Sequence, residues 1–356
     1  MVLVGNFQFQ RITFNMYKDI TVSKGSMLYF NEYSGECIFA TNRHITIDVQ
    51  AGRTRLKLPF RLLDLFGFSR LCSRLFRLDR VNLLYIDDAN LAFLRQGVVF
   101  HYCRKTGHLS EAYRLSSTRN ILAESCASGP DGQLVFGDYG GKGRKDGVYI
   151  YRSYDYGRSW APCFQFPQGA VKQVLAINWD LDSLNYWINT GDDVGECFLW
   201  RFNENLELLE RVGDGSLSFR AISCWVFPDL ISWVTNDPFN GSRLMSLDLY
   251  TRKLTRGERI DGSVWYSKRL ADGCMVLTTC AEVLSWDSED CVKVLAAQGE
   301  DGFKVIRKYS KDSFSKWLFR FGIASFPQGV YSSENLHINF EAVKTLDGKV
   351  VRVDLS

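Results

Sequence analysis

The chain has 356 residues, and 46% of them are hydrophobic, which is enough for a large buried core. A formal net charge of +3 does not point to nucleic acid as a partner. The N-terminal run MVLVGNFQFQRITF lacks a secretory signal pattern, and no apolar run reaches the length of about 18 residues that a spanning helix needs. Ten cysteines, none in a CxxC pair or at zinc spacing with a histidine, predict a reducing, cytoplasmic setting with no metal and no cofactor.

Short apolar or alternating runs, separated by turns rich in Gly, Asp, Asn and Pro, predict an all-β protein. The clearest repeating unit predicts four strands at Asn120–Ser128, Gln133–Asp138, Gly147–Ser153 and Trp160–Phe166. Similar units follow one another from Arg80 to the end of the chain, at the period of about 40–50 residues that is typical of β-propeller blades. We therefore predict one β-propeller domain over 1–356, built from four-stranded antiparallel blades.

Residues 7–58 supply further strands, beginning with the run NFQFQRITF. Counting these strands gives seven blades, with the first strand completing the last blade and closing the ring. Closure of this kind leaves no exposed sheet edge. Six blades is the alternative if 27–50 is an appendage.

The sequence Ser153-Tyr-Asp-Tyr-Gly-Arg-Ser-Trp160 matches the pattern S-x-D-x-G-x-x-W between the third and fourth predicted strands of its unit. Gly157 permits a positive φ in that turn, and Ser153 and Asp155 can bind its backbone amides. Partial copies recur one blade apart, at Arg201, Asn203, Asn205 and Leu208, then at Ser246 and Asp248, and then at Ser285 and Asp287.

On these motifs the chain resembles the Asp-box (BNR-repeat) β-propellers of the sialidase-like superfamily. More narrowly, it is similar to bacterial "glycosyl hydrolase" BNR proteins encoded among capsule and O-antigen polysaccharide genes. The chain has no histidine at 172–175, where that narrower group has histidines, and it has no recognisable sialidase arginine triad. The segments that carry the resemblance are the Asp box, Phe136–Tyr139, Thr190–Asp192, Phe219–Ala221, Thr235–Asp237, Val264–Ser267 and Phe326–Gly329.

Strand order predicts the face on which a site would lie. If the strands of a blade are lettered A to D along the chain, the A–B and C–D turns lie on one face of the ring, and the B–C turns and D–A connections lie on the other. The Asp box is a C–D turn, so it marks the face opposite a site built by B–C loops. Acidic residues recur where strand B ends, on that second face: Asp138, Asp192, Asp237, Glu282 and Glu341.

Carboxylates near basic and aromatic side chains suit glycosyl chemistry, in which two carboxyl groups act about 5–10 Å apart or a tyrosine replaces the nucleophile. The catalytic candidates are Asp138, Asp192, Asp237, Glu282 and Tyr266. The substrate-binding candidates are Arg220, Lys172, Asn120, Tyr139, Lys268 and Glu196. The alternative is that these acidic residues only begin turns, and that Arg220 is a structural partner of Asp237 or Asp192.

One segment does not fit the propeller pattern. Residues 53–80 hold seven Arg and one Lys against two Asp, and residues 59–79 predict a short amphipathic helical insertion. Its apolar side is predicted to hold Leu65, Phe68, Leu71, Cys72, Leu75 and Phe76, and its opposite side Arg70, Arg74 and Arg77. Such a helix suits the surface of an anionic membrane. The alternative is a helix packed on the propeller with its arginines in water.

Two functions remain open from the sequence. The first is a glycan-active protein of bacterial surface polysaccharide metabolism, similar to a glycoside hydrolase, that acts on an oligo- or polysaccharide in the propeller funnel. The second is a non-catalytic propeller that binds a glycan or a protein of a polysaccharide assembly system. In both cases we expect a cytoplasmic protein, with a peripheral position on the inner membrane as an extension.

Overall fold

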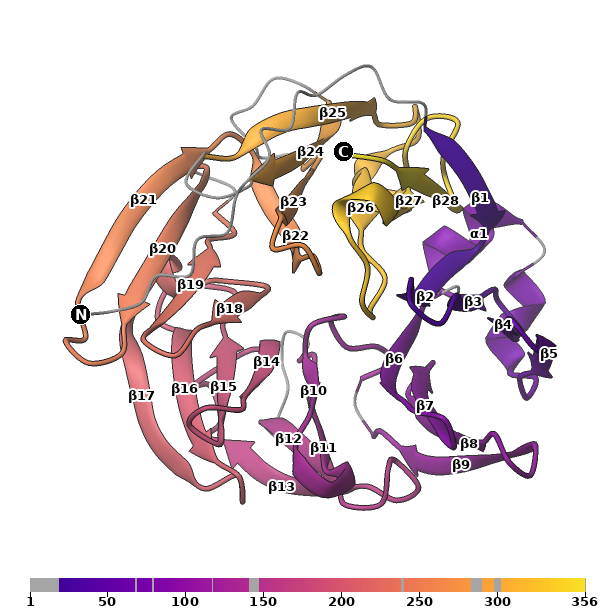
Figure 1. Cartoon of the computed structure of the whole chain (residues 1–356), viewed down its shortest axis with the longest axis horizontal. Coiled ribbons are helices and arrows are strands. Elements are labelled where there is room, and N and C mark those ends of the chain that lie inside the picture. Colours follow the sequence, from indigo (N-terminus) through magenta and orange to yellow (C-terminus); the bar gives the residue numbers. More distant parts are fainter. Residues whose placement is uncertain are drawn as a thin grey trace.

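The computed structural model describes residues 19–67, 69–78, 80–116, 118–140, 147–237, 240–282, 290–297 and 302–355. These residues form seven four-stranded antiparallel sheets arranged in a ring (Figure 1). The predicted all-β propeller of seven blades is confirmed. The six-blade alternative is wrong, because residues 27–50 belong to a complete blade rather than to an appendage.

Six blades consist of four consecutive strands each. The first two hold β2 (Ser26–Asn31), β3 (Glu36–Ala40), β4 (His44–Val49) and β5 (Gly52–Lys57), then β6 (Val81–Ile86), β7 (Asn90–Arg95), β8 (Val98–Cys103) and β9 (His108–Arg114). The third and fourth hold β10 (Cys126–Ser128), β11 (Leu134–Gly137), β12 (Val148–Ser153) and β13 (Ala161–Phe166), then β14 (Val174–Asp180), β15 (Asn185–Thr190), β16 (Cys197–Asn203) and β17 (Leu208–Gly215). The fifth and sixth hold β18 (Cys224–Val226), β19 (Leu230–Val234), β20 (Ser242–Asp248) and β21 (Leu254–Ile260), then β22 (Ser263–Arg269), β23 (Met275–Cys280), β24 (Cys291–Ala297) and β25 (Lys304–Ser310).

The seventh blade joins the two ends of the chain. Its strands are β26 (Ile323–Ser325), β27 (Leu336–Glu341), β28 (Lys349–Val353) and, on the outside, β1 (Ile20–Lys24). β1 pairs antiparallel with β28 and closes the ring, so an N-terminal strand completes the last blade as predicted, but this strand is Ile20–Lys24 and was not itself among the predicted strands. The predicted strand in the run Asn6–Phe14 lies outside the described residues.

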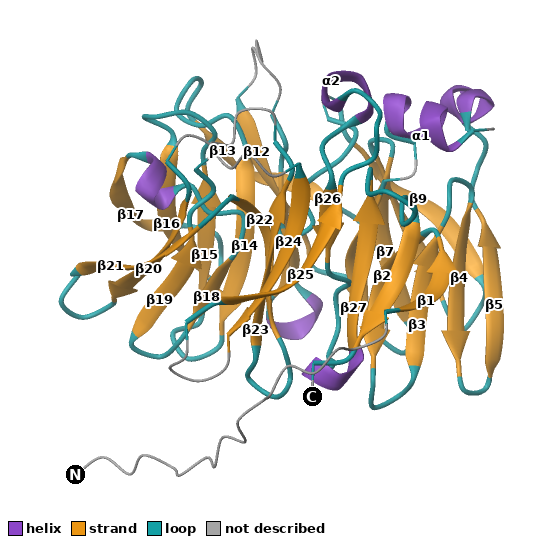
Figure 2. Cartoon of the chain, turned by 90° about the horizontal axis from the view of Figure 1, so that it is seen from above, coloured by secondary structure: helices purple, strands orange, loops and turns teal. Residues whose placement is uncertain are grey.

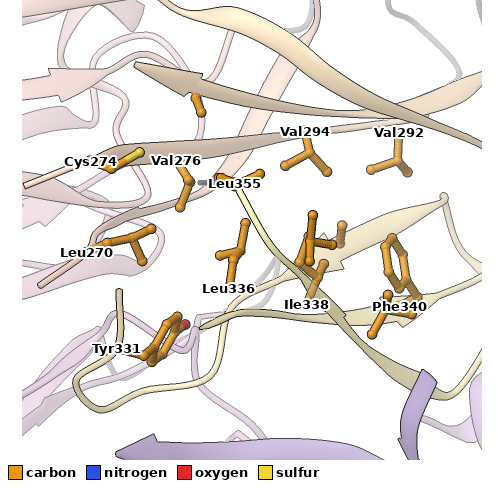
Figure 3. Packing of buried hydrophobic residues seen from close by; sticks show 14 of the residues in the cluster. Leu270, Cys274, Val276, Val292, Val294, Tyr331, Leu336, Ile338, Phe340 and Leu355 are labelled. Atoms are coloured by element: carbon orange, nitrogen blue, oxygen red, sulfur yellow. The ribbon is translucent and has the colours of Figure 1, made fainter. Parts of the chain in front are cut away.

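The core consists of apolar clusters between neighbouring blades. Between the sixth and seventh blades, Val276 and Val294 pack with Leu336 and Ile338, and all four side chains are fully buried (Figure 3). Leu336 and Ile338 alternate with polar residues along β27, so they lie on the same face of the strand. The apolar residues of the alternating sequence pattern therefore form the contact between neighbouring blades.

The Asp box forms the predicted turn between β12 and β13. The Ser153 hydroxyl accepts a hydrogen bond from Gly157 N at 2.9 Å, and Asp155 accepts one from Ser159 N at 2.9 Å. Gly157 has a φ of +86°, and Trp160 is buried against Phe136 with the ring centroids 4.8 Å apart. The turn is thus held by its own side chains.

Short helices lie in the connections. The two α-helices are α1 (Arg70–Phe76) and α2 (Lys316–Phe319), and the four 3-10 turns are η1 (Leu62–Phe66), η2 (Pro130–Gly132), η3 (Leu217–Phe219) and η4 (Ser333–Asn335). Both α-helices lie in D–A connections, and they lie on the same face of the ring (Figure 2). This surface, which also carries the B–C turns, is called the helix face below. No described helix has the length and apolar character needed to cross a bilayer.

The segment 59–79 differs from the predicted single helix, because η1 and α1 are separate. The prediction that Arg74 belongs to a solvent-facing stripe is wrong: the residue is 2% exposed, and its guanidinium binds Asp312 and the Phe319 carbonyl. Leu65 and Leu75, predicted on the opposite, apolar side, are exposed, in contrast to the alternative in which that side packs on the propeller. Phe68 lies outside the described residues.

Candidate functional site

Three of the predicted site residues form one ion cluster on the helix face. Lys172 precedes β14, Asp192 follows β15, and Arg220 follows η3. The Asp192 carboxylate accepts two hydrogen bonds. Lys172 Nζ donates to Oδ2, and Arg220 Nη2 donates to Oδ1 at 2.8 Å. Lys172 also lies 3.8 Å from Asp193. Arg220 is therefore a partner of Asp192, one of the two pairings left open by the sequence.

The other predicted acidic residues lie in separate local settings. Asp138 follows β11 and is fully buried. Asp237 accepts from Asn240 N at 3.0 Å and lines a cavity of about 170 Å³ beside the outer strand β21. Glu282 accepts from Trp265 Nε1 at 3.0 Å. Glu196 lies in the B–C turn of the fourth blade, where its amide donates to the Asp193 carbonyl.

Tyr266 of the sixth blade lines a cavity of about 140 Å³, whose other lining residues come from the seventh, first and second blades and from the connection before the third. The other polar side chains of the lining include Arg80, Asn82, Asn339 and Glu341. This space is called the inner cavity below. With Arg70 and Gln328, which also line it, the cavity holds a phenol, two guanidinium groups, three amides and a carboxylate, a set that suits a polar ligand with several hydroxyl groups.

Charges surround the Tyr266 phenol. Burial raises the pKa of Tyr266, the nearby Arg80 charge opposes that rise, and the Glu341 charge adds to it. Glu341 is held by Arg320, whose Nη1 lies 2.7 Å from Oε1 and 2.8 Å from Oε2. Arg320 is buried, and no local sequence pattern predicts its role because its partner is 21 residues away.

A second cavity, of about 320 Å³, adjoins the first, because Arg80 and Ile121 line both. It is called the outer cavity below. Its lining also includes Arg77, Arg119, Asn120 and Tyr139, so two predicted substrate-binding residues meet there. Arg77 and Arg119 are exposed, and neither forms an ion pair with a described residue. The Asn120 amide oxygen is buried and accepts no hydrogen bond among the described residues.

Near the centre of the ring, Lys268 and Glu124 form an electrostatic pair, of which only Lys268 was predicted from the sequence. Lys268 was a binding candidate, and its ammonium group donates to the Gly329 carbonyl at 3.0 Å. Burial lowers the pKa of Lys268, and the Glu124 charge opposes that change. Burial also raises the pKa of Glu124. Glu124 was not a predicted site residue, because the sequence placed it inside an ordinary strand over Asn120–Ser128.

The described residues contain no group of three or more His, Cys, Asp or Glu side chains arranged to hold a metal ion. All ten cysteines are free thiols.

No protein-family model matches the chain, and no curated protein matches it in sequence. Among solved structures, it is similar to the extracellular domain of the putative one component system BT4673 from B. thetaiotaomicron, with a TM-score of 0.57, 10% identity, and coverage of 96% of this chain and 40% of that one. It is also similar to the Niastella koreensis GH74 enzyme, with a TM-score of 0.51, 14% identity, and coverage of 82% and 47%. The structure of U3-55K matches with a TM-score of 0.56, 11% identity, and coverage of 95% and 98%.

At these identities the likeness shows the propeller fold alone. The chain spans less than half of the first two structures it matches. Nothing in these matches is specific to the Asp-box family.

Proposed function

We propose that this propeller binds a carboxylated oligosaccharide across the inner and outer cavities of the helix face, in the metabolism of bacterial surface polysaccharides. The observation that carries the proposal is the group of three arginines, Arg77, Arg80 and Arg119, that lines the outer cavity with Asn120 and Tyr139. Guanidinium groups bind carboxylates through paired, charge-assisted hydrogen bonds. Amide groups and a half-exposed tyrosine ring suit the hydroxyls and the apolar face of a sugar.

The closeness of the two cavities favours a ligand longer than one sugar. Arg80 lines both, so the proposed ligand would place one sugar in the outer cavity and the next on the Tyr266 side of Arg80. The resemblance to propellers encoded with capsule and O-antigen genes agrees with a polysaccharide ligand, and so does the likeness in fold to the GH74 enzyme.

The test is isothermal titration with a carboxylated oligosaccharide and with the same oligosaccharide after its carboxyl groups are reduced to alcohols. We expect the wild-type chain to prefer the carboxylated form. The double variant Arg77→Ala/Arg119→Ala should weaken its binding on the order of 100-fold, since two charge-assisted contacts are lost. Arg252→Ala is the matched control, because Arg252 is a partly exposed arginine in a C–D turn on the opposite face. Equal binding of both ligand forms, or an unchanged double variant, contradicts the proposal.

A second candidate function, glycoside hydrolysis, rests on Tyr266 and Glu341 sharing the inner cavity. A tyrosine nucleophile beside a carboxylate is one known route to glycoside cleavage, and Asp138, Asp192, Asp237 and Glu282 remain further candidates for the acid and base. Tyr266→Phe should abolish turnover of a bound oligosaccharide while the binding affinity stays within about threefold, because only one hydroxyl is removed. If the wild-type chain binds the oligosaccharide and releases no product, the binding function stands and the hydrolytic one is excluded.

A further inference from the structure

The helix face carries a group of large apolar side chains in water. They come from the connection that holds η1 and α1 and from the one that holds α2. Trp317 is 88% exposed and Leu62 75%, which leaves almost the whole of both side chains outside the protein. We call the following set the apolar patch: Phe60, Leu62, Leu65, Phe66, Leu75, Phe314, Trp317 and Leu318.

The two connections that carry these residues lie against each other. Phe66 of η1 packs on Phe76 of α1, with the ring centroids 4.6 Å apart. Arg74 of α1 lies over the Phe314 ring at 5.8 Å and binds the Phe319 carbonyl at the end of α2. The two connections are therefore fixed to each other as well as to the propeller (Figure 2).

Two charged side chains of these helices, Asp64 and Arg74, point into the protein, whereas the Arg70 side chain is 36% exposed and Arg77, at the end of α1, is exposed. Asp64 of η1 is paired with Arg95, and both side chains are fully buried. Arg74 of α1 is buried against Asp312. A surface helix normally buries its apolar side and exposes its charges. In this protein, the two ion pairs hold the helices in an orientation in which leucine and aromatic side chains face outward.

We propose that the apolar patch is a docking surface for an anionic lipid bilayer. Monomeric proteins rarely expose a contiguous apolar patch of this kind unless it binds something. Trp and Leu on short helices beside cations are the side chains that enter the boundary between headgroups and acyl chains. The cations present are Arg77, exposed two residues after Leu75, and Arg43, which lies 5.2 Å from the Phe60 ring. Their positive charge matches anionic headgroups rather than an apolar partner alone.

Membrane docking is a property beyond the proposed function, and it would also fix the position of the outer cavity relative to the bilayer. Leu75 belongs to the apolar patch and lines the outer cavity. A bilayer seated on the patch therefore lies beside the mouth of the cavity. In that position the cavity would receive a carboxylated glycan presented at the membrane surface.

The test is co-sedimentation of the full chain with vesicles of phosphatidylcholine alone, and with vesicles of phosphatidylcholine and phosphatidylglycerol in equal parts. We expect the wild-type chain to sediment with the anionic vesicles and to remain in solution with the neutral ones. In the double variant Leu62→Ser/Trp317→Ser, partition should fall by at least about tenfold, because two side chains that enter the bilayer are lost. The variant should fold normally, because both residues are exposed and neither lines a cavity.

The matched control is Tyr33→Ser/Tyr250→Ser. Tyr33 and Tyr250 are 73% and 81% exposed, and they lie in A–B and C–D turns on the opposite face. This control should sediment like the wild type. The proposal is overturned if the Leu62→Ser/Trp317→Ser variant sediments normally, or if the wild type binds neither vesicle. It is also overturned if analytical ultracentrifugation shows a dimer that the variant dissociates, since the patch would then join two copies. Oligosaccharide binding should be unchanged in the variant, so failure here and failure of the proposed function are separate results.

Discussion

Arg74 of α1 donates from Nε to the main-chain carbonyl of Phe319 at 2.9 Å, and its Nη1 lies 2.5 Å from Asp312. These partners are 245 and 238 residues away in the sequence. One buried guanidinium thus joins the connection after the first blade to the connection before the seventh. Since the first and seventh blades meet where the ring closes, this contact braces the closure on the helix face.

We predict that Arg74→Met destabilises the fold by about 3 kcal/mol, because it leaves the Phe319 carbonyl and the Asp312 carboxylate, whose side chain is only 12% exposed, without this donor. Arg70→Met is the control. Arg70 pairs with Asp347 at 3.1 Å but is 36% exposed in its side chain, so its loss should cost about 1 kcal/mol or less. Urea unfolding followed by tryptophan fluorescence measures both changes. If both variants lose the same free energy of unfolding, Arg74 does not stabilise the closure of the ring more than Arg70 does.

The sequence predicted a helical segment within 59–79, but not its division into η1 and α1, and it could not tell which side chains face the protein. That choice depends on Asp312 and the Phe319 carbonyl, which are supplied from the far end of the chain. The helix α2 was not predicted, because its short run of four residues has no helical period to detect. The side-chain pattern alone therefore missed the burial of Arg74, and it left open whether Leu75 is buried or exposed.

Strand prediction in the third blade was close for three strands and too long for the inner one. The predicted strand Asn120–Ser128 is paired only over Cys126–Ser128. Ser125 N donates to the Leu122 carbonyl, so the chain turns before the strand begins. That turn places Asn120 at the outer cavity and Glu124 near the centre of the ring. The sequence predicted the face of the ring on which Asn120 lies. It could not predict how individual charges pair, because those pairs form between blades.

The Asp-box turn should contribute to stability but not to ligand binding, since it lies on the face opposite the cavities. Ser153→Ala removes a buried acceptor for Gly157 N and should cost about 1–3 kcal/mol. Gly157→Ala should cost more, because an added Cβ lies 2.6 Å from the Ala92 Cβ at a φ of +86°. Ser246→Ala, at the equivalent position of a partial copy, is the milder control. Thermal unfolding ranks the three variants, and a loss of oligosaccharide binding in Ser153→Ala would contradict the assignment of faces.

His337 should make the fold sensitive to acid. Its ring packs on Phe30 and donates through Nδ1 to the Asn335 carbonyl, and burial lowers its pKa from 6.5 to about 4. In the unfolded chain the imidazole keeps its ordinary pKa, so between about pH 6.5 and pH 4 the unfolded state binds the proton more tightly. Stability should therefore fall as pH falls through that window, with about 3 kcal/mol lost through this residue by pH 4.

The measurement is urea unfolding of the wild type and of His337→Gln from pH 7 to about pH 4. Glutamine keeps a donor for the Asn335 carbonyl and does not titrate, so the variant should lose less stability over this range. His108 is exposed, and His108→Gln should show the same pH dependence as the wild type. Parallel curves for all three proteins would show that His337 is not the acid-sensitive group.

The ion cluster around Asp192 gives a test that separates a structural role from a catalytic one. Asp192→Asn leaves Lys172 and Arg220 facing each other without the carboxylate between them, and all three side chains are 18–22% exposed. We expect a loss of about 1–2 kcal/mol of stability, moderated by partial access to solvent. Adding Lys172→Met removes one of the two repelling cations, so the double variant should recover part of that loss, with a coupling energy of about 1 kcal/mol. If Asp192 is instead a catalytic carboxylate, Asp192→Asn should abolish oligosaccharide turnover, and Lys172→Met should not restore it. Recovery of stability without any change in turnover would assign Asp192 to holding the fourth and fifth blades together.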